Sequence, residues 1–437
     1  MTTASITPEQ IDNQVRDLEA TAVDRLATLV AEDSQVGHEA GALQRMADWY
    51  SEAGLDVERL AVDPNLLRER RGFSPPLTEY TPGRENVLGS HRVDTGNRRG
   101  RSLILNGHVD VVPPGPASLW TTPPFEPVVR DGRMYGRGAG DMKAGLIASL
   151  TALQALHELG VEPAAPLQLQ TVIEEECTGN GALACVTAGH TADAAIIPEP
   201  FNRQLMIAQV GVMWARLTVS GRPSHVLDTG AGLNAIDAAH RLCQHLADRV
   251  EQWNGPEHRH PLWADHPHPL NFNLGRIEGG DWASTVACQA VADVRVGFFP
   301  GADLDAVRSE IHTTLERARA EDPELAGIEV EVTWRGFQAE GCTMDRDDPL
   351  MTHLTAIHEQ VTGTPIVPLA TTATTDARFF QLYGNTPVTC YGPEADAIHG
   401  LDESVSITST MEVTAVLARF IADWCGLQPR RSETGAR

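Results

Sequence analysis

The feature that most constrains the fold is a strand, a helix and a second strand that follow one another closely between residues 101 and 176. RSLILNGHVDVV (Arg101 to Val112) is a compact β-branched and leucine-rich run, and APLQLQTVIEEE alternates apolar and polar residues up to Ile173. Between them, MKAGLIASLTALQALHELG is apolar at helical spacing and ends at Gly160, a suitable C-cap. This order is typical of a βαβ unit, so we expect a doubly wound, mainly parallel α/β sheet that binds ligands beyond the carboxyl ends of its strands.

A second pattern begins near Gly211 and predicts a strand, a helix, two strands, a helix and a last strand. The segments are GVMWARLTVSG, GLNAIDAAHRLCQHLADRVEQW, LNFNLGRIEGG, QAVADVRVGFF, DLDAVRSEIHTTLERARA and IEVEVTWRGF. This βαββαβ order is that of a ferredoxin-like module. Helices and short strands return after Gly336, so we expect a discontinuous catalytic domain of residues 1–209 and 336–437 around an inserted lid or dimerisation domain of residues 210–335.

Composition excludes several classes of function. The chain has 437 residues, with 34 Lys and Arg against 59 Asp and Glu, and its net charge of −25 would repel nucleic acids and anionic membranes. The N-terminal residues MTTASITPEQIDNQ contain no apolar signal segment, and no apolar run is long enough to span a bilayer. Seven cysteines without a C-x-x-C pair favour reduced thiols. We therefore expect a soluble cytoplasmic protein with no nucleic-acid or membrane partner.

Several polar residues follow the apolar segments, and each of them is unremarkable alone. A lone H-x-D pair such as His108 and Asp110 is usually a satisfied polar pair, and Asp141 could be only an N-cap. The run Glu174 to Glu176 could be a solvated loop, Glu199 follows an apolar stretch, and His399 lies in a polar loop.

Together these residues are far more informative, because four of the sites follow strand-like segments whose ends share one edge of the predicted sheet. Histidine nitrogens and carboxylate oxygens suit zinc, cobalt or manganese. A carboxylate that bridges two such ions, roughly 3.5 to 4 Å apart, clamps a shared water and polarises a carbonyl. A nearby glutamate that binds no metal would then act as general base.

The chain resembles a known family along nearly its whole length. The segments that carry the resemblance are NGHVDVVPPG, PPFEPVVRDGRMYGRGAGDMKAG, TVIEEECTGNGA, IIPEP and SGRPSHVLDTGAGLNAI. In this order they are similar to the signatures of the dinuclear zinc amidohydrolase and peptidase family of acetylornithine deacetylase, succinyl-diaminopimelate desuccinylase, carboxypeptidase G and aminoacylase. The resemblance implies two divalent metal ions per subunit, zinc first, with cobalt or manganese as alternatives.

The resemblance also implies a role for each of these residues. Asp141 would bridge the two ions, His108 and Glu199 would complete one site, and Glu176 and His399 would complete the other. Glu175 would be the base, and Asp110 would hold the His108 ring from behind. Either Glu174 and Glu175 or Glu175 and Glu176 could be the base and the ligand. The family usually places a glycine five residues after the ligand, and Gly181 favours the second pair.

Residues of the inserted module receive roles in the same way. The resemblance implies that His225 reaches the active site of the partner in a homodimer and stabilises the oxyanion, and that Arg295 binds a substrate carboxylate. In the segment Asp281 to Ala290, where many relatives have an Asn-rich turn, polar substrate contacts would have to come from Ser284 or Thr285.

Two further segments remain outside this assignment. Residues 65–86 look like an insertion that shapes the mouth of the site, and the four histidines between His258 and His268 indicate a polar surface loop rather than a third metal site. Lys143, the only lysine in the chain, is expected to start a helix and form a local ion pair.

The predicted activity is hydrolysis of the amide bond of a small N-acyl amino acid or a related compound by a metal-activated water. Two alternatives remain: a dipeptidase or aminopeptidase that uses the same metals, and a metal-binding regulatory dimer without catalysis. The second would need neither Glu175 nor His225, and both are present.

Overall fold

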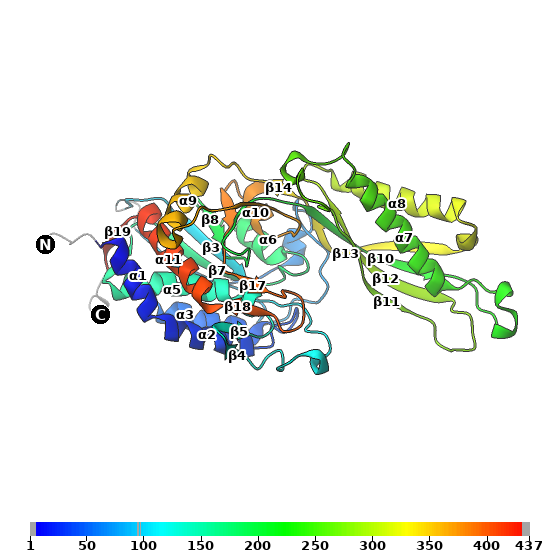
Figure 1. The fold of residues 1–437 in the computed structure, drawn as a ribbon, viewed down its shortest axis with the longest axis horizontal. Coiled ribbons are helices and arrows are strands. Elements are labelled where there is room, and N and C mark those ends of the chain that lie inside the picture. The colour runs from blue at the N-terminus through cyan, green and yellow to red at the C-terminus, as the bar shows by residue number, and fades with distance from the viewer. Residues whose placement is uncertain (1–5, 94–95, 97, 431–437) are drawn as a thin grey trace.

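The computed structural model describes residues 6–93, 96 and 98–430. They form two units with separate hydrophobic cores, and the second unit extends away from the first (Figure 1). The helices of the larger unit are α1 (Pro8–Asp17), α2 (Glu19–Ala31), α3 (Ala40–Glu52), α4 (Pro64–Leu67), α5 (Ala144–Glu158), α6 (Asn180–Thr187), α9 (Pro349–Thr362), α10 (Ala377–Leu382) and α11 (Ile407–Cys425).

The main sheet of the larger unit has six strands in the order β1-β2-β7-β3-β8-β16. Their bounds are β1 (Asp56–Leu60), β2 (Asn86–His91), β3 (Leu103–His108), β7 (Leu167–Val172), β8 (Ala195–Ile197) and β16 (Val388–Cys390). The strands β7, β3, β8 and β16 are parallel, whereas β1 and β2 add an antiparallel edge. The expected mainly parallel α/β sheet is therefore confirmed.

Three small sheets complete the larger unit. They consist of β9 (Leu205–Gln209) with β14 (Cys342–Thr343) and β15 (Pro368–Thr371), of β4 (Val128–Arg130) with β5 (Arg133–Tyr135), β17 (Ala395–Asp396) and β18 (Ser404–Ser406), and of β6 (Val161–Pro163) with β19 (Leu427–Pro429).

The predicted βαβ unit is formed by β3, α5 and β7. Every residue of β3 is buried, and nearly all of α5 is buried because it is apolar around its whole circumference. The two strands run parallel from Leu103↔Leu167 to His108↔Val172. Their carboxyl ends, followed by His108 and by the glutamate run, therefore lie side by side.

The smaller unit, which we call the lid, is an antiparallel sheet in the order β11-β12-β10-β13 with two helices. Its elements are β10 (Gly211–Ser220), α7 (Ala235–Trp253), β11 (Phe272–Gly279), β12 (Gln289–Phe298), α8 (Leu304–Glu321) and β13 (Glu329–Ala339). This is the predicted βαββαβ module. Along β10 and β12 buried residues alternate with more exposed ones, and the buried face packs against α7 and α8 (Figure 1). The last lid strand continues to Ala339, beyond the predicted boundary at residue 335.

Candidate metal centre and substrate cavity

The predicted metal-binding residues come together at the carboxyl edge of the main sheet. His108 is the last residue of β3, Glu175 and Glu176 follow β7, and Glu199 follows β8. Asp141 lies in the irregular turn Ala139–Lys143 before α5, and His399 lies in the loop between β17 and β18.

Asp141 occupies the centre of this cluster. Its Oδ1 lies 3.2 Å from Nε2 of His108, and its Oδ2 lies 3.4 Å from Nε2 of His399. Glu199 approaches His108 to 3.7 Å, and Glu176 approaches His399 to 3.0 Å. One carboxylate thus faces two histidines, each accompanied by a further carboxylate.

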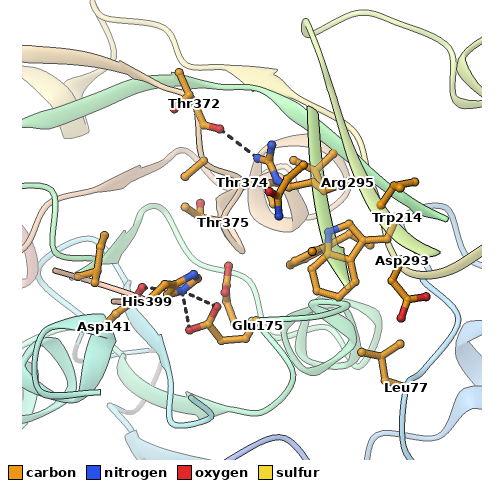
Figure 2. Close-up of a pocket in the computed structure, with 18 of the residues that line it drawn as sticks. Leu77, Asp141, Glu175, Trp214, Asp293, Arg295, Thr372, Thr374, Thr375 and His399 are labelled. Atoms are coloured by element: carbon orange, nitrogen blue, oxygen red, sulfur yellow. Dashed lines mark hydrogen bonds and ion pairs between the residues drawn. The ribbon is translucent and has the colours of Figure 1, made fainter. Parts of the chain in front are cut away.

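Glu175 lies in the same cluster, with Oε2 4.0 Å from Nε2 of His108. Its Oε1 is buried and has no hydrogen-bond partner among the described residues. Figure 2 shows its side chain beside Asp141 and His399 at the inner end of a cavity. Distances alone do not separate the base from the ligands, because Glu175, His108 and Glu199 could also hold an ion together.

Asp110 holds the His108 ring through its backbone carbonyl, whereas we expected its side chain to do so. The His108 ring is held by the backbone carbonyl of Asp110, 2.8 Å from Nδ1, whereas the Asp110 carboxylate lies 3.8 Å away. That carboxylate accepts hydrogen bonds from the backbone N–H groups of Glu175 and Glu176 at 3.2 and 3.1 Å. Asp110 therefore connects the end of β3 to the turn after β7.

Glu174 points away from the cluster into a buried network, so the interpretation of the glutamate run as a solvated loop is wrong. Its carboxylate accepts hydrogen bonds from Tyr80 at 2.5 Å and from Thr178 at 2.8 Å, and it lies 3.4 Å from Arg84. Arg84 also binds Glu39 through two hydrogen bonds of 2.6 and 2.9 Å. With its side chain held here, Glu174 is unavailable to the cluster.

The segment of residues 65–86 supplies Tyr80 and Arg84 and also touches the lid. Ser74 exchanges hydrogen bonds with the Asn180 side chain at 3.2 and 2.8 Å, and its hydroxyl accepts one from the Gln338 N–H of β13 at 3.0 Å. Leu77 lines the cavity. The segment thus joins the turn after β7 to the lid and contributes to the wall of the cavity.

Glu403 organises the loop that carries Asp141, and apart from its position four residues after His399 nothing in the sequence pattern predicts this role. Its carboxylate accepts hydrogen bonds from the N–H groups of Gly138, Gly140 and Asp141 at 3.0 to 3.1 Å and from Arg137 at 2.5 Å. Glu403, which follows the loop of His399, therefore connects that loop to the loop of Asp141.

Lys143 is fully buried, and its ammonium group donates to the Glu32 carbonyl at 2.9 Å. The expected local ion pair is thus replaced by a bond to a backbone oxygen. Burial lowers the pKa of Lys143 to about 7.

The pKa shifts of the clustered residues show that the cluster contains too little positive charge for its carboxylates. Glu176, followed by Asp141, raises the pKa of His399 to about 11, against the opposing effect of burial. Burial raises the pKa of Glu199 well above its usual range, and the neighbouring Asp141 raises it further. Burial likewise raises the pKa of Glu175. Two histidines do not balance this many close carboxylates, so the cluster suits cations.

The donor set fits divalent metal ions. Imidazole nitrogen and carboxylate oxygen are the ligands that zinc, cobalt and manganese accept. Two groups of ligand atoms lie close enough to share an ion, one formed by His108, Glu175 and Glu199 and one by His108, Asp141 and Glu176. Nε2 of His108 faces the cluster, and Nδ1 lies against the carbonyl of Asp110. This arrangement is common for metal-binding histidines.

A cavity of about 560 Å³ lies between the cluster and the lid. Its inner wall contains Asp141, Glu175, Glu176, Glu199 and His399, and strands of the lid sheet form the opposite wall. Figure 2 shows Trp214, Asp293 and Arg295 on the lid side and the loop of Thr372, Thr374 and Thr375 above the carboxylates. Arg295 thus lines the same cavity as the carboxylates, and it donates hydrogen bonds to the carbonyls of Asn271 and Thr372 at 3.3 and 3.2 Å.

His225 lies outside this cavity, on an exposed loop of the lid. It pairs with Thr285 in an isolated antiparallel bridge, and the Ser284 carbonyl accepts the Val226 N–H at 3.3 Å. Ser284 and Thr285 contact the loop of His225. Neither of them lines the cavity of its own chain.

The surface around His225 is apolar. Leu227 is 89% exposed and Trp282 is 72% exposed, and further exposed apolar side chains of the lid are Val226, Ile236 and Ile277. A contiguous exposed apolar patch is typical of a contact surface.

The His-rich segment contacts neighbouring parts of the lid, including Phe299, whose ring centroid lies 6.1 Å from that of His260. Nδ1 of His260 and of His266 accept nearby backbone N–H groups, and His268 lies 2.6 Å from Glu251. In the described part of the chain, the candidate metal-binding groups do not include these histidines. Among the described helices, none has the length and apolar character needed to cross a membrane.

Comparison with known proteins gives a consistent result. The model of peptidase family M20/M25/M40 matches residues 104–423. An N-formyl-4-amino-5-aminomethyl-2-methylpyrimidine deformylase of Bacillus subtilis (strain 168) is 29% identical over 374 residues, which are 81% of this chain and 86% of the relative.

Solved structures of two dipeptidases are similar in fold. Dug1p from Saccharomyces cerevisiae superposes with a TM-score of 0.78 and 14% identity, covering 97% of this chain and 99% of that one. Human carnosine dipeptidase 1 gives a TM-score of 0.77 with 16% identity, covering 96% of this chain and all (100%) of that one.

Proposed function

The chain belongs to peptidase family M20/M25/M40 and is a metal-dependent hydrolase of amide bonds, and from this premise we propose how its residues carry out the reaction. The observation that carries the proposal is the Asp141 carboxylate, which faces His108 with one oxygen and His399 with the other. We propose that the cluster would hold two divalent ions, zinc first, and that Asp141 would contribute a ligand to both.

His108 and Glu199 complete one ion site, and Glu176 and His399 complete the other. The pairing follows the distances, since Glu199 approaches His108 and Glu176 approaches His399. Ions held here would lower the pKa of a water molecule and polarise the substrate carbonyl.

Glu175 acts as the general base. Its Oε1 is buried and unpartnered, which leaves it free to accept a proton from the attacking water and to return that proton to the leaving amine. The Asp110 carboxylate fixes the backbone of Glu175 and Glu176 and so keeps the base aimed into the cavity. Glu174 is already engaged by Tyr80, so it does not compete for the role.

His225 completes the site from a second copy of the chain. It lies outside the cavity of its own chain, two residues before the exposed Leu227, and its bridge partner Thr285 donates a backbone hydrogen bond to the exposed Trp282. A two-fold dimer through this surface would bury these residues and present each His225 to the partner subunit equivalently. There it would donate a hydrogen bond to the oxygen of the attacked carbonyl.

We assign as substrate a small N-acyl amino acid or a related amide. Arg295 is half-buried, and among the described residues its hydrogen bonds go to two carbonyl oxygens, so it has donors to offer a substrate carboxylate. The name of the Bacillus subtilis relative describes removal of a formyl group, so N-formyl compounds are also candidates.

The test is a panel of N-acetyl, N-formyl and N-succinyl amino acids and unblocked dipeptides, with released amine measured for zinc-loaded protein. We expect release from the N-acyl compounds. Cleavage of the dipeptides alone would replace the proposal by a dipeptidase or aminopeptidase on the same metal site.

A further inference from the structure

Arg378, on α10, is a fully buried arginine that joins two parts of the site. Its Nη2 donates a hydrogen bond to the backbone carbonyl of Thr178, and its Nη1 donates one to the backbone carbonyl of Thr375, both at 2.8 Å. Thr178 belongs to the turn that carries Glu175, and Thr375 lines the same cavity as Glu175 (Figure 2). The guanidinium therefore connects the turn of the proposed base to a loop that borders the substrate.

Aromatic rings and a close backbone approach hold this guanidinium in one place. Its central carbon lies 4.1 Å from the ring centroid of Phe379 and 5.4 Å from that of Phe337, on the last lid strand β13. Gly179, with φ of 71°, lies against the other atoms of the group. A Cβ at Gly179 would come within 2.4 Å of Nη2 of Arg378 and of the Phe379 ring. The absence of a side chain at Gly179 thus allows the arginine to reach the turn.

Stability alone does not account for an arginine at this position. Complete burial of a guanidinium is costly unless a carboxylate forms hydrogen bonds with it. Asp376 interacts with Arg378 electrostatically, but both oxygens of its buried carboxylate lack a hydrogen-bond partner among the described residues. Nε of Arg378 also lacks one in the described chain. An apolar side chain of similar volume would avoid these costs, so the arginine calls for a functional explanation.

The turn can transmit the hold of Arg378 to Glu175 because it is closed by its own hydrogen bonds. The N–H of Thr178 donates to the carbonyl of Glu174 at 2.9 Å, which leaves Glu175 inside the closed turn. At the other end, the Asp110 carboxylate accepts the N–H of Glu175 at 3.2 Å. The backbone of Glu175 is therefore fixed from two sides, by Asp110 and by Arg378.

We propose that Arg378 is a positioning residue for the general base, which holds Glu175 at a fixed distance from the loop of Thr375 and hence from the substrate. Its complete burial keeps it from touching the substrate itself. The inference rests on the proposed function, in which Glu175 takes the proton of the attacking water.

The test measures kcat, KM and metal per chain, with kcat expressed per folded molecule. Arg378→Lys keeps the positive charge but loses the planar fork that reaches two carbonyls. Because a misplacement of about 1 Å can cost about a hundred-fold in rate, we expect kcat to fall about ten- to a hundred-fold. KM and metal content should change little.

Gly179→Ala tests the same contact with Arg378 still present, since the added Cβ would push the guanidinium off the turn. It should also lower kcat per folded molecule, and it replaces Arg378→Lys if that variant does not fold. Arg84→Lys is the matched control, because Arg84 is a buried arginine that contacts the same turn through the Glu174 side chain. It should lower stability and leave kcat per folded molecule unchanged.

A double-mutant cycle then asks whether Arg378 acts through the base. In the Glu175→Gln background, Arg378→Lys should lower the residual kcat by less than about threefold, because residues that act as a unit are not additive.

An unchanged kcat per folded molecule in the variants at Arg378 and Gly179 would overturn the inference and leave the proposed function intact. A full further loss in the Glu175→Gln background would do the same. Full turnover of Glu175→Gln alone would instead show that the proposed base is wrong, and the positioning role would fail with it.

Discussion

Replacing Glu175 by glutamine separates the general base from the metal ligands. The change keeps the shape of the side chain and removes its basicity, and the carboxylate has no hydrogen-bond partner on Oε1 to lose. Because proton transfer by a positioned group contributes about a hundred- to ten-thousand-fold, turnover should fall by that factor. This equals about 3 to 5 kcal/mol of activation free energy.

The neighbouring glutamates are controls matched in residue type and position. Glu176→Gln removes a carboxylate that lies 3.0 Å from His399, so we expect loss of metal along with loss of activity. Glu174→Gln disturbs the bonds to Tyr80, Thr178 and Arg84, so it should lower the free energy of unfolding by about 1 to 3 kcal/mol. The turnover of its folded molecules should change little.

The assay measures released amine, metal per chain by elemental analysis and urea-induced unfolding for all three variants. Glu175→Gln should keep its metal and its stability while losing turnover. If Glu174→Gln keeps metal and loses turnover whereas Glu175→Gln loses metal, the register of base and ligand is wrong by one residue.

Three further outcomes are expected. Dialysis against a chelator should abolish amide hydrolysis and zinc, cobalt or manganese should restore it; full activity in metal-free protein would contradict the metal centre. Mixing inactive His225→Ala subunits with inactive Glu175→Gln subunits, with exchange shown independently, should restore activity, because one site of each mixed dimer then carries neither defect; its absence would place His225 in its own chain's site. Glu403→Gln should weaken metal affinity about ten- to a hundred-fold, measured by competition with a chromogenic chelator, because the loop of Asp141 loses its anchor; unchanged affinity would refute that role.

Much of the fold could be predicted from local pattern. The apolar run of α5 and the alternation of β7 specify a βαβ unit by themselves, and all six elements of the lid follow from periodicities of 3.6 and 2. The convergence of His108 with Glu176 and Glu199 needed one more rule, that parallel strands end at a common edge.

The remaining features depend on contacts between distant segments. Glu174 is buried beside Tyr80 and Arg84, which lie ninety or more residues earlier in the chain. Periodicity contains no information about such a contact. The tether on His108 is the carbonyl of Asp110 rather than its carboxylate, and that choice depends on ring orientation.

The reactivity of Lys143 can be used to measure how often the turn Ala139–Lys143 opens. Lys143 is the only lysine in the chain, it is the last residue of the turn that carries Asp141, and its buried ammonium group donates a hydrogen bond to the Glu32 carbonyl. A reagent that acylates amines can reach this side chain only while the turn is open. The rate of acylation at one known position, followed by peptide mass spectrometry, therefore measures how often the turn detaches, and added zinc should slow it if Asp141 holds the metal.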